Sequence, residues 1–228
     1  QAHRFMNLRK CASIRKFGVE ELRSALAPDA AAGQKAAFDR FAETGLPHHK
    51  IEAWKYTSLV HLARSGFQPA PANIDLPTAL PQKLAGTVRL VFVNGRYAKA
   101  LSDEDAASVI RSEPVSDLGA EAVDDPMLVL AAALSPSEEQ LTLNHQALPI
   151  ELLFVTVPGA AAQMSHVRQA VTVEAGASAT IAERHVTIGG GGTTLANGST
   201  RIELGEGATL DHVKLQAEAA NANHVWHH

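Results

Sequence analysis

The segment Val171-Thr172-Val173-Glu174-Ala175-Gly176-Ala177 combines β-branched residues with a glycine turn, and its pattern recurs along the second part of the chain. Units of the form apolar–x–apolar also start at Val155, Val186 and Ile202, so successive starts lie 16, 15 and 16 residues apart. Regular spacing without intervening helical segments is typical of coils that stack and extend a continuous β-surface. The spacing therefore predicts a β-solenoid over residues 151–228, with these four apolar residues at equivalent inward positions on successive coils.

A sandwich of short antiparallel hairpins is the alternative, because strands spaced about 8–12 residues apart also bring frequent turns. Gly-Ala pairs follow three of the four units, at Gly159-Ala160, Gly176-Ala177 and Gly207-Ala208. This repeated turn favours the solenoid over the sandwich.

Helices are predicted only in the first part of the chain. Apolar residues at helical spacing predict helices over 19–26 and 34–44, and Gly45 stands where a helix C-terminus favours glycine. A third helix is expected over 127–134, because Asp125-Pro126 combines an N-cap with proline at the first helical position.

A β-hairpin is predicted over residues 88–101, where the apolar period changes to that of a strand. Asn94-Gly95 supplies the two positive φ angles of its tight turn. Residues 66–83, which contain four prolines, are expected to form a loop or extended linker. The chain is thus predicted to be mainly β, with a small α+β domain over 1–150 and the solenoid over 151–228.

Residues 46–59 hold one of the two Trp and one of the two Tyr of the chain. We interpret Trp54 and Tyr56 as packing anchors that pin the N-terminal helices onto the first domain, because large aromatic side chains usually serve packing. Two local structures stay open. Residues 51–62 fit one helix with an apolar face, whereas Thr57 also suits the N-cap of a new helix after an extended segment.

Composition indicates a soluble protein whose core is built mostly from aliphatic side chains. Hydrophobic residues make up 46% of the 228 residues, but aromatic residues only 5%. The net charge of −4 gives no overall signature of nucleic-acid or anionic-membrane binding. Residues 1–16 are basic, yet no apolar run follows them as a secretory signal requires. The longest apolar run, 127–134, is too short to span a bilayer, so a cytoplasmic location is expected.

Catalytic motifs are not found in the sequence. A single cysteine, Cys11, excludes an intramolecular disulfide and an all-cysteine cluster or zinc site built from this chain alone. The glycine run Gly189–Thr194 lacks the lysine of a phosphate-binding loop and leads into no helix, so we interpret it as a turn between coils. Ser165 and His166 are merely adjacent, which is no nucleophile–base geometry. We therefore expect no catalytic residues.

Two pairs of metal-type ligands occur in the predicted solenoid: Glu183-x-His185 and Asp211-His212. If the coils stack as predicted, Glu183 and His185 lie about 27 residues before Asp211 and His212, and the two pairs approach each other. Carboxylate and imidazole groups together suit Fe or Zn, while hydrogen-bonded or solvent-facing histidines are the alternative. Other histidines are interpreted as surface or terminal residues, namely His48, His49, His224, His227 and His228.

The stretch around residues 46–59 also carries a family resemblance. Gly45-Leu46-Pro47, followed by Glu52-Ala53-Trp54-Lys55-Tyr56-Thr57, resembles the signature of the SufB/SufD family of iron–sulfur cluster assembly proteins. Segments 90–97, 205–208 and 212–216 are similar to the SufD branch and follow in the same order, and the single cysteine leaves little for SufB-like sulfur chemistry. The signature residues are expected to be structural: Glu52, Trp54, Lys55, Tyr56 and Thr57.

The resemblance implies a right-handed parallel β-helix in the second half of the chain. It also implies a non-catalytic scaffold subunit of the SUF complex, with a SufB-like paralogue and a SufC-like ATPase as partners and a homodimer as a further option. Nucleic acid and membrane are not expected as partners. No cofactor is expected on this segment, and an iron–sulfur cluster or iron only in the full complex. The family's later coils and C-terminal helical domain, which contacts the ATPase, are expected to lie beyond this chain.

Two other functions fit a β-helix less well. A carbohydrate lyase or esterase needs carboxylates and a base along one groove, and Glu183, Arg184 and Asp211 are the only candidates for such a groove. A hexapeptide-repeat acyltransferase is disfavoured, because the spacing of 15–16 residues is not a multiple of six.

Overall fold

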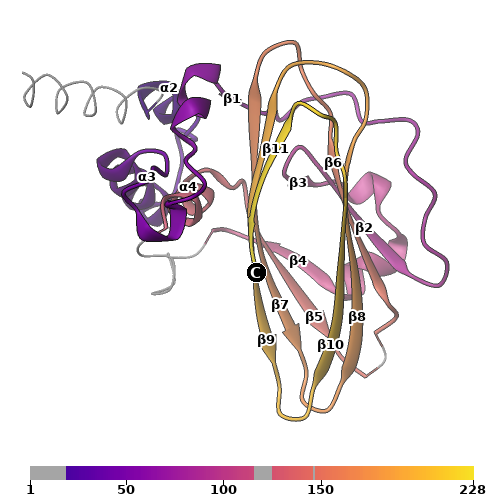
Figure 1. Ribbon diagram of the computed structural model, residues 1–228. Coiled ribbons are helices and arrows are strands. Elements are labelled where there is room, and N and C mark those ends of the chain that lie inside the picture. Colours follow the sequence, from indigo (N-terminus) through magenta and orange to yellow (C-terminus); the bar gives the residue numbers. More distant parts are fainter. Residues whose placement is uncertain (1–18, 116–124, 146) are drawn as a thin grey trace, which may run out of the picture.

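The computed structural model describes residues 19–115, 125–145 and 147–228, so the basic segment 1–16 and Cys11 lie outside the described residues. The chain is mainly β, as predicted. Two sheets face one another, and a small group of helices lies beside one of them (Figure 1). Within the described residues, no helix is both long and apolar enough to cross a membrane.

The first sheet has the strand order β11-β9-β7-β5-β4, and the short β1 also pairs with β7. The second sheet has the order β10-β8-β6-β2-β3. The strands of the first sheet are β1 (Gln68–Pro69), β4 (Ile110–Glu113), β5 (Glu138–Leu143), β7 (Gln163–Val173), β9 (Thr194–Leu204) and β11 (Ala222–His227). Those of the second are β2 (Val88–Val93), β3 (Arg96–Tyr97), β6 (Ile150–Thr156), β8 (Ser178–Thr187) and β10 (Thr209–Ala217).

From β5 to β11, successive strands alternate between the two sheets, and from β7 onward each pairs in parallel with the strand two places before it. Val171 is therefore opposite Ile202 in the first sheet, and Val155 is opposite Val186 in the second, each pair 31 residues apart. The spacing of 15–16 residues is half of this structural repeat. The parallel pairing contradicts the sandwich of antiparallel hairpins.

The predicted inward positions are only half correct. Val171 and Ile202 pack in the core between the sheets. Val155 and Val186 pack instead on the other face of the second sheet, because the inward residue of β6 is Phe154 and adjacent side chains of a strand point to opposite faces. That outer face is covered by the partly buried residues Ile74, Leu80, Ala98 and Leu101.

The predicted hairpin is confirmed by β2 and β3, with Asn94 at φ 47° and Gly95 at φ 81°. Every residue of β2 is buried, since this strand lies inside a mainly parallel sheet that is covered on both faces. Because β2 and β5 pair with β6 and β7, the two sheets contain strands from both sides of residue 150. Two short 3₁₀ helices follow the hairpin, η3 (Lys99–Leu101) and η4 (Glu104–Ser108).

The glycine run is the turn that joins β8 to β9, as predicted. Its backbone lies directly against the turn that joins β6 to β7, where the Gly192 N–H donates to the Gly159 carbonyl oxygen at 2.7 Å. A Cβ atom on Gly191 would lie 2.4 Å from that oxygen, and one on Gly192 would lie 2.5 Å from the carbonyl oxygen of Ala161. Only glycine allows the successive turns to stack this closely.

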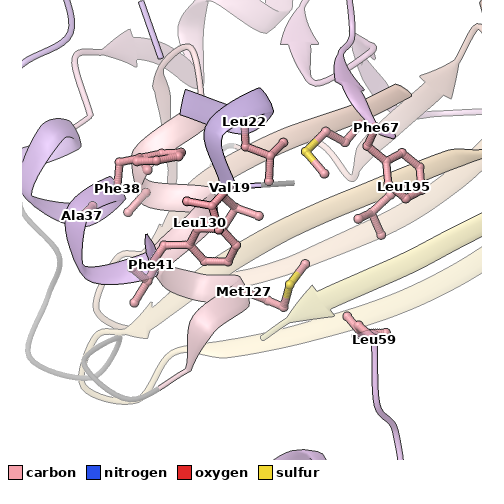
Figure 2. Packing of buried hydrophobic residues seen from close by; sticks show 14 of the residues in the cluster. Val19, Leu22, Ala37, Phe38, Phe41, Leu59, Phe67, Met127, Leu130 and Leu195 are labelled. Atoms are coloured by element: carbon pink, nitrogen blue, oxygen red, sulfur yellow. The ribbon is translucent and has the colours of Figure 1, made fainter. Parts of the chain in front are cut away.

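The helices form a layer on the outer side of the first sheet (Figure 1). They are α2 (Val19–Arg23), α3 (Ala32–Thr44) and α4 (Pro126–Leu134), so all three predicted helices form, the first shorter than expected. Figure 2 shows Phe38 and Phe41 of α3 beside Leu130 of α4 in this apolar cluster. The Asn197 side chain donates to the Met127 carbonyl oxygen at 2.9 Å and joins α4 to β9.

The 46–59 stretch forms a short 3₁₀ helix, η1 (Glu52–Trp54), and a second, η2 (Val60–Ser65), follows it. Trp54 is buried in the helical cluster, and its Nε1 donates to Asp125 Oδ2 at 2.8 Å, which confirms it as a packing anchor. The prediction for Tyr56 is wrong, because this side chain is 92% exposed and contacts the Lys55 ammonium instead. In the short 3₁₀ helix and the turn after it, the Trp54 side chain points into the cluster and the Tyr56 side chain points to solvent.

Candidate functional site

The core between the sheets changes character from β6 to β10 across the second sheet. The inward positions of β6, β8 and β10 form three columns. These columns are Ile150, Ile181, His212; Leu152, Glu183, Lys214; and Phe154, His185, Gln216. Strand β6 is thus apolar at all three positions, whereas β8 and β10 place ionisable groups in the same layer.

Glu183 is the centre of the polar part and is fully buried. Its Oε1 lies 2.5 Å from His185 Nε2 and 3.1 Å from Lys214 Nζ. Its Oε2 lies 2.9 Å from His212 Nε2 and 3.0 Å from His228 Nε2. One carboxylate therefore collects three imidazoles and one ammonium group from β8, β10 and the end of β11.

The carboxylate of Glu183 stays ionised in this setting. Burial alone would raise the pKa of Glu183, but the hydrogen bonds from His185, His212 and His228 lower it far below the usual range of a glutamate. Burial also lowers the pKa of His185, against the opposing effect of Glu183, so this imidazole favours its neutral form. The negative charge is thus balanced mainly by Lys214 and by hydrogen-bond donors.

A second group of ligand-type side chains lies beside the first and contains His185, Glu218 and His224, whose ligand atoms lie within 4.8 Å of one another. The His224 Nδ1 atom is 3.0 Å from Glu218 Oε2. Within the described part of the chain, neither buried ring nitrogen of His224 has a hydrogen-bond partner.

Aromatic rings close the site on the side of the first sheet. The Trp226 indole lies flat over Gly198, where a Cβ atom would be only 2.6 Å from the ring carbons. Its Nε1 donates to Thr200 Oγ1 at 3.0 Å. The His185 ring stacks on Phe154, with ring centres 4.7 Å apart and planes at 10°. The imidazole of His185 is therefore fixed in orientation by its packing.

Of the four predicted metal ligands, the structure brings three together: Glu183, His185 and His212. Asp211 does not join them, because it precedes the inward His212 by one position and its side chain lies exposed on the other face of β10. His228 is exposed, as predicted, and His224 is part-buried, yet both also face the site. His224, Trp226 and His228 occupy every second position, so their side chains share one face of a strand, and this spacing is the sequence signal that could have placed them together.

A second buried charged cluster, on the outer face of the second sheet, is fully paired. Glu151 accepts hydrogen bonds from Arg89 Nε at 2.9 Å and Arg89 Nη2 at 3.0 Å, and from Arg184 Nη1 at 2.5 Å. The Leu84 N–H adds a fourth hydrogen bond at 3.1 Å. These bidentate and backbone contacts complete the shell of Glu151, so this cluster connects the 66–88 segment to the sheet and leaves no position for a ligand.

The family signature lies apart from this site. Four of its five residues are exposed: Glu52, Lys55, Tyr56 and Thr57. Trp54 alone is buried, which agrees with a structural role for that residue.

Comparisons with known proteins agree with the resemblance seen in the sequence. Residues 155–228 match the family described as "SUF system FeS cluster assembly, SufBD core domain". The chain is 32% identical over 198 residues to the iron–sulfur cluster assembly protein SufD of Escherichia coli, covering 81% of this chain and 45% of that protein. It is 28% identical over 221 residues to an iron–sulfur cluster assembly SufBD family protein of Synechocystis, covering 84% of this chain and 48% of the relative.

The chain spans about half the length of the curated relatives that it matches. The matched core domain covers β7 to β11 and thus includes Glu183 and the four side chains described above at its carboxylate. The similarity to the two relatives extends over most of the chain, including its first half. The chain belongs to the SufB/SufD family of iron–sulfur cluster assembly proteins.

Proposed function

We propose that the complete protein is a SufD-like scaffold subunit of a SUF iron–sulfur cluster assembly complex in the cytoplasm. Its proposed partners are a SufB-like paralogue and a SufC-like ATPase. The observation that carries this proposal is the combination of a SufBD core domain over residues 155–228 with 32% identity to a SufD protein along most of the chain. The subunit is proposed to assemble partners rather than to catalyse a reaction.

The two sheets are proposed to be the first coils of a right-handed parallel β-helix. Strands that alternate between two sheets, with parallel pairing and a 31-residue repeat, support this architecture. Among the described strands, β10 and β11 stand at the ends of their sheets, so each presents an unpaired backbone edge. Such edges pair readily with additional strands, and we propose that further coils stack there.

A scaffold role also fits the chemistry of the chain better than the alternative, a carbohydrate-active enzyme. The three groups considered for such an enzyme do not converge: Glu183 faces the core, Arg184 is paired with Glu151, and Asp211 is exposed. The glycine run is a stacking turn rather than a phosphate-binding loop. We accordingly expect the 228-residue chain to show no ATP hydrolysis above a buffer control in a phosphate-release assay.

Affinity capture of the complete tagged protein tests the proposal. We expect a SufB-like protein and a SufC-like ATPase to co-purify in stoichiometric amounts, as identified by mass spectrometry and size-exclusion chromatography. Cells that lack the gene should lose activity of iron–sulfur enzymes and regain it when the gene is restored. Capture of neither partner, together with normal iron–sulfur enzyme activity in the deletion strain, would contradict the proposal.

A further inference from the structure

We propose that Glu183, His212 and His228 form a binding site for one divalent first-row transition metal ion, either Fe²⁺ or Zn²⁺, between the two sheets. All three ligands belong to this chain, so the site does not depend on the partners named above. Metal binding by the chain alone and capture of partner proteins are separate measurements, and either can fail without the other.

The geometry of the three ligand atoms already suits one ion. The Nε2 atoms of His212 and His228 lie 2.9 and 3.0 Å from the same oxygen, Oε2 of Glu183. All the ligand atoms lie within 4.8 Å of one another. Ligands about 2.1 Å from a tetrahedral ion are roughly 3.4 Å apart, so only small side-chain shifts are needed to admit the metal.

The kinds of ligand also indicate the class of metal. Two imidazoles and one carboxylate bind Zn²⁺ with a fourth position open, and the same set with more open positions binds Fe²⁺. A calcium or magnesium ion would prefer a shell made of oxygen atoms. The two nitrogen ligands of this site therefore favour Fe²⁺ or Zn²⁺ over these harder ions.

The surrounding residues orient the carboxylate for this role. His185 contacts Oε1 of Glu183, which leaves Oε2 directed at the two imidazoles. His185 is itself held by stacking on Phe154. Outer groups that fix a ligand in this way are a regular part of metal sites and strengthen binding.

Lys214 acts as the counter-charge of Glu183 while the site holds no metal. A bound dication would be repelled by the ammonium group, whose nitrogen lies 3.1 Å from Oε1. The Lys214 side chain is part-exposed and also lies over the Trp226 ring, so it has room to turn toward solvent when a metal enters. Lys214 is therefore expected to lower the affinity of the site for a metal ion. If the Glu183–Lys214 ion pair were purely structural, replacing Lys214 would not change metal affinity.

The test titrates the purified, chelator-treated chain with metal ions. Co²⁺ serves as the spectroscopic probe for coordination number, Zn²⁺ is followed by calorimetry, and Fe²⁺ is added without oxygen. We expect one ion per chain, and competition between Fe²⁺ and Zn²⁺ reports which of the two binds more tightly. His212→Gln and His228→Gln should each weaken binding about a hundredfold or more, and Lys214→Met should tighten it by about tenfold.

Asp211→Asn is the matched control, because Asp211 adjoins His212 but lies exposed on the opposite face of β10. Its affinity should equal that of the wild type. Glu183→Gln tests the central ligand, and the more exposed His212→Gln and His228→Gln variants keep the test valid if Glu183→Gln does not fold. The proposal is overturned if the wild type binds no metal, or if binding survives in both histidine variants, or if Asp211→Asn weakens binding as much as they do.

Discussion

The two halves of the core between the sheets occupy equivalent positions yet contain opposite chemistry. Leu152 and Phe154 of β6 stand directly beside Glu183 and His185 of β8. All four residues are buried, and their strands pair in the same parallel register. The fold therefore accepts either chemistry at these positions, and the charged half has to be explained by something other than strand formation.

Energetics sharpens this contrast. Burying a leucine or phenylalanine side chain stabilises a fold by roughly 1.5–3 kcal/mol, whereas burying a carboxylate is unfavourable unless it is paired. Glu183 is paired by His185, His212, His228 and Lys214, yet even a well-paired buried ion is often no better than an apolar side chain of similar volume. Charged groups that stand where the core favours apolar side chains, and that do not stabilise the fold, are most often retained for function.

The largest expected effect comes from moving the charge into the apolar half. Leu152→Glu places a carboxylate beside Ile150 and Phe154 and directly opposite the buried Glu183 of β8, so it adds like-charge repulsion to the cost of burial. We expect this variant to unfold or to collect in the insoluble fraction, because several kcal/mol is a large share of a total stability of about 5–15 kcal/mol. Circular dichroism of the soluble fraction measures this, with Leu152→Ala, at about 2–5 kcal/mol, as the milder control. A folded, stable Leu152→Glu protein would remove the distinction between the two halves.

The family signature at residues 52–57 offers a second contrast, because Trp54 is buried in the helical layer and Tyr56 is exposed. Trp54→Ala should lower the free energy of unfolding by about 3–5 kcal/mol, because it removes a buried ring from the apolar cluster and its hydrogen bond to Asp125. Tyr56→Ala should change it by less than about 0.5 kcal/mol, since that ring is exposed. Thermal and urea unfolding of the two variants side by side provide the measurement. Equal losses would show that Tyr56 is also a packing residue.

A part-buried carboxylate outside the Glu183 site, Asp125, offers a comparison that can be followed by pH. Asp125 caps α4 through the N–H groups of Met127 and Leu128 and accepts the Trp54 hydrogen bond. Burial by itself would raise the pKa of Asp125, but its contacts with His227, Trp54 and the helix backbone lower it below the ordinary value of 3.8. A lowered folded-state pKa means that this stabilisation is present above about pH 4 and is lost as the pH falls through the folded-state pKa.

Asp125→Asn is the control for this titration, because asparagine also caps helices but does not titrate. The wild type should be more stable than the variant at neutral pH, by about 1 kcal/mol, and this difference should shrink below pH 4. Urea unfolding between pH 2.5 and 7 measures it. A difference that stays constant over this range would show that the Asp125 charge does not contribute.

Local signals in the sequence predicted the local structure well. Asp125-Pro126 begins a helix because an N-cap and a proline act within one turn, and Asn94-Gly95 forms a hairpin because only its own φ angles decide the turn. The repeat of β-branched units revealed strands, but its spacing does not show that alternate units enter different sheets. For this reason Val155 was predicted to face the same core as Val171, although it does not.

The same limit applied to the site. Glu183, His185 and His212 were found because ligand-type residues about one coil apart approach each other when coils stack. Asp211 was wrongly included because neighbours in a sequence point to opposite faces of a strand. His228 was missed because its contact with Glu183 crosses from one sheet to the other, and that relation appears only once the path of the chain between the sheets is known.

The claim that the charged half serves function rather than stability is tested most directly by copying the apolar coil into it. The triple variant is Glu183→Leu, His185→Phe, Lys214→Met. Its first two changes give β8 the leucine and phenylalanine that β6 has at the paired positions. The third removes the ammonium group that would otherwise lose its carboxylate partner. In metal-free buffer, urea unfolding should show a free energy equal to that of the wild type or higher by about 1–4 kcal/mol. A loss of more than about 2 kcal/mol would show that the charged cluster stabilises the fold, and would contradict the account.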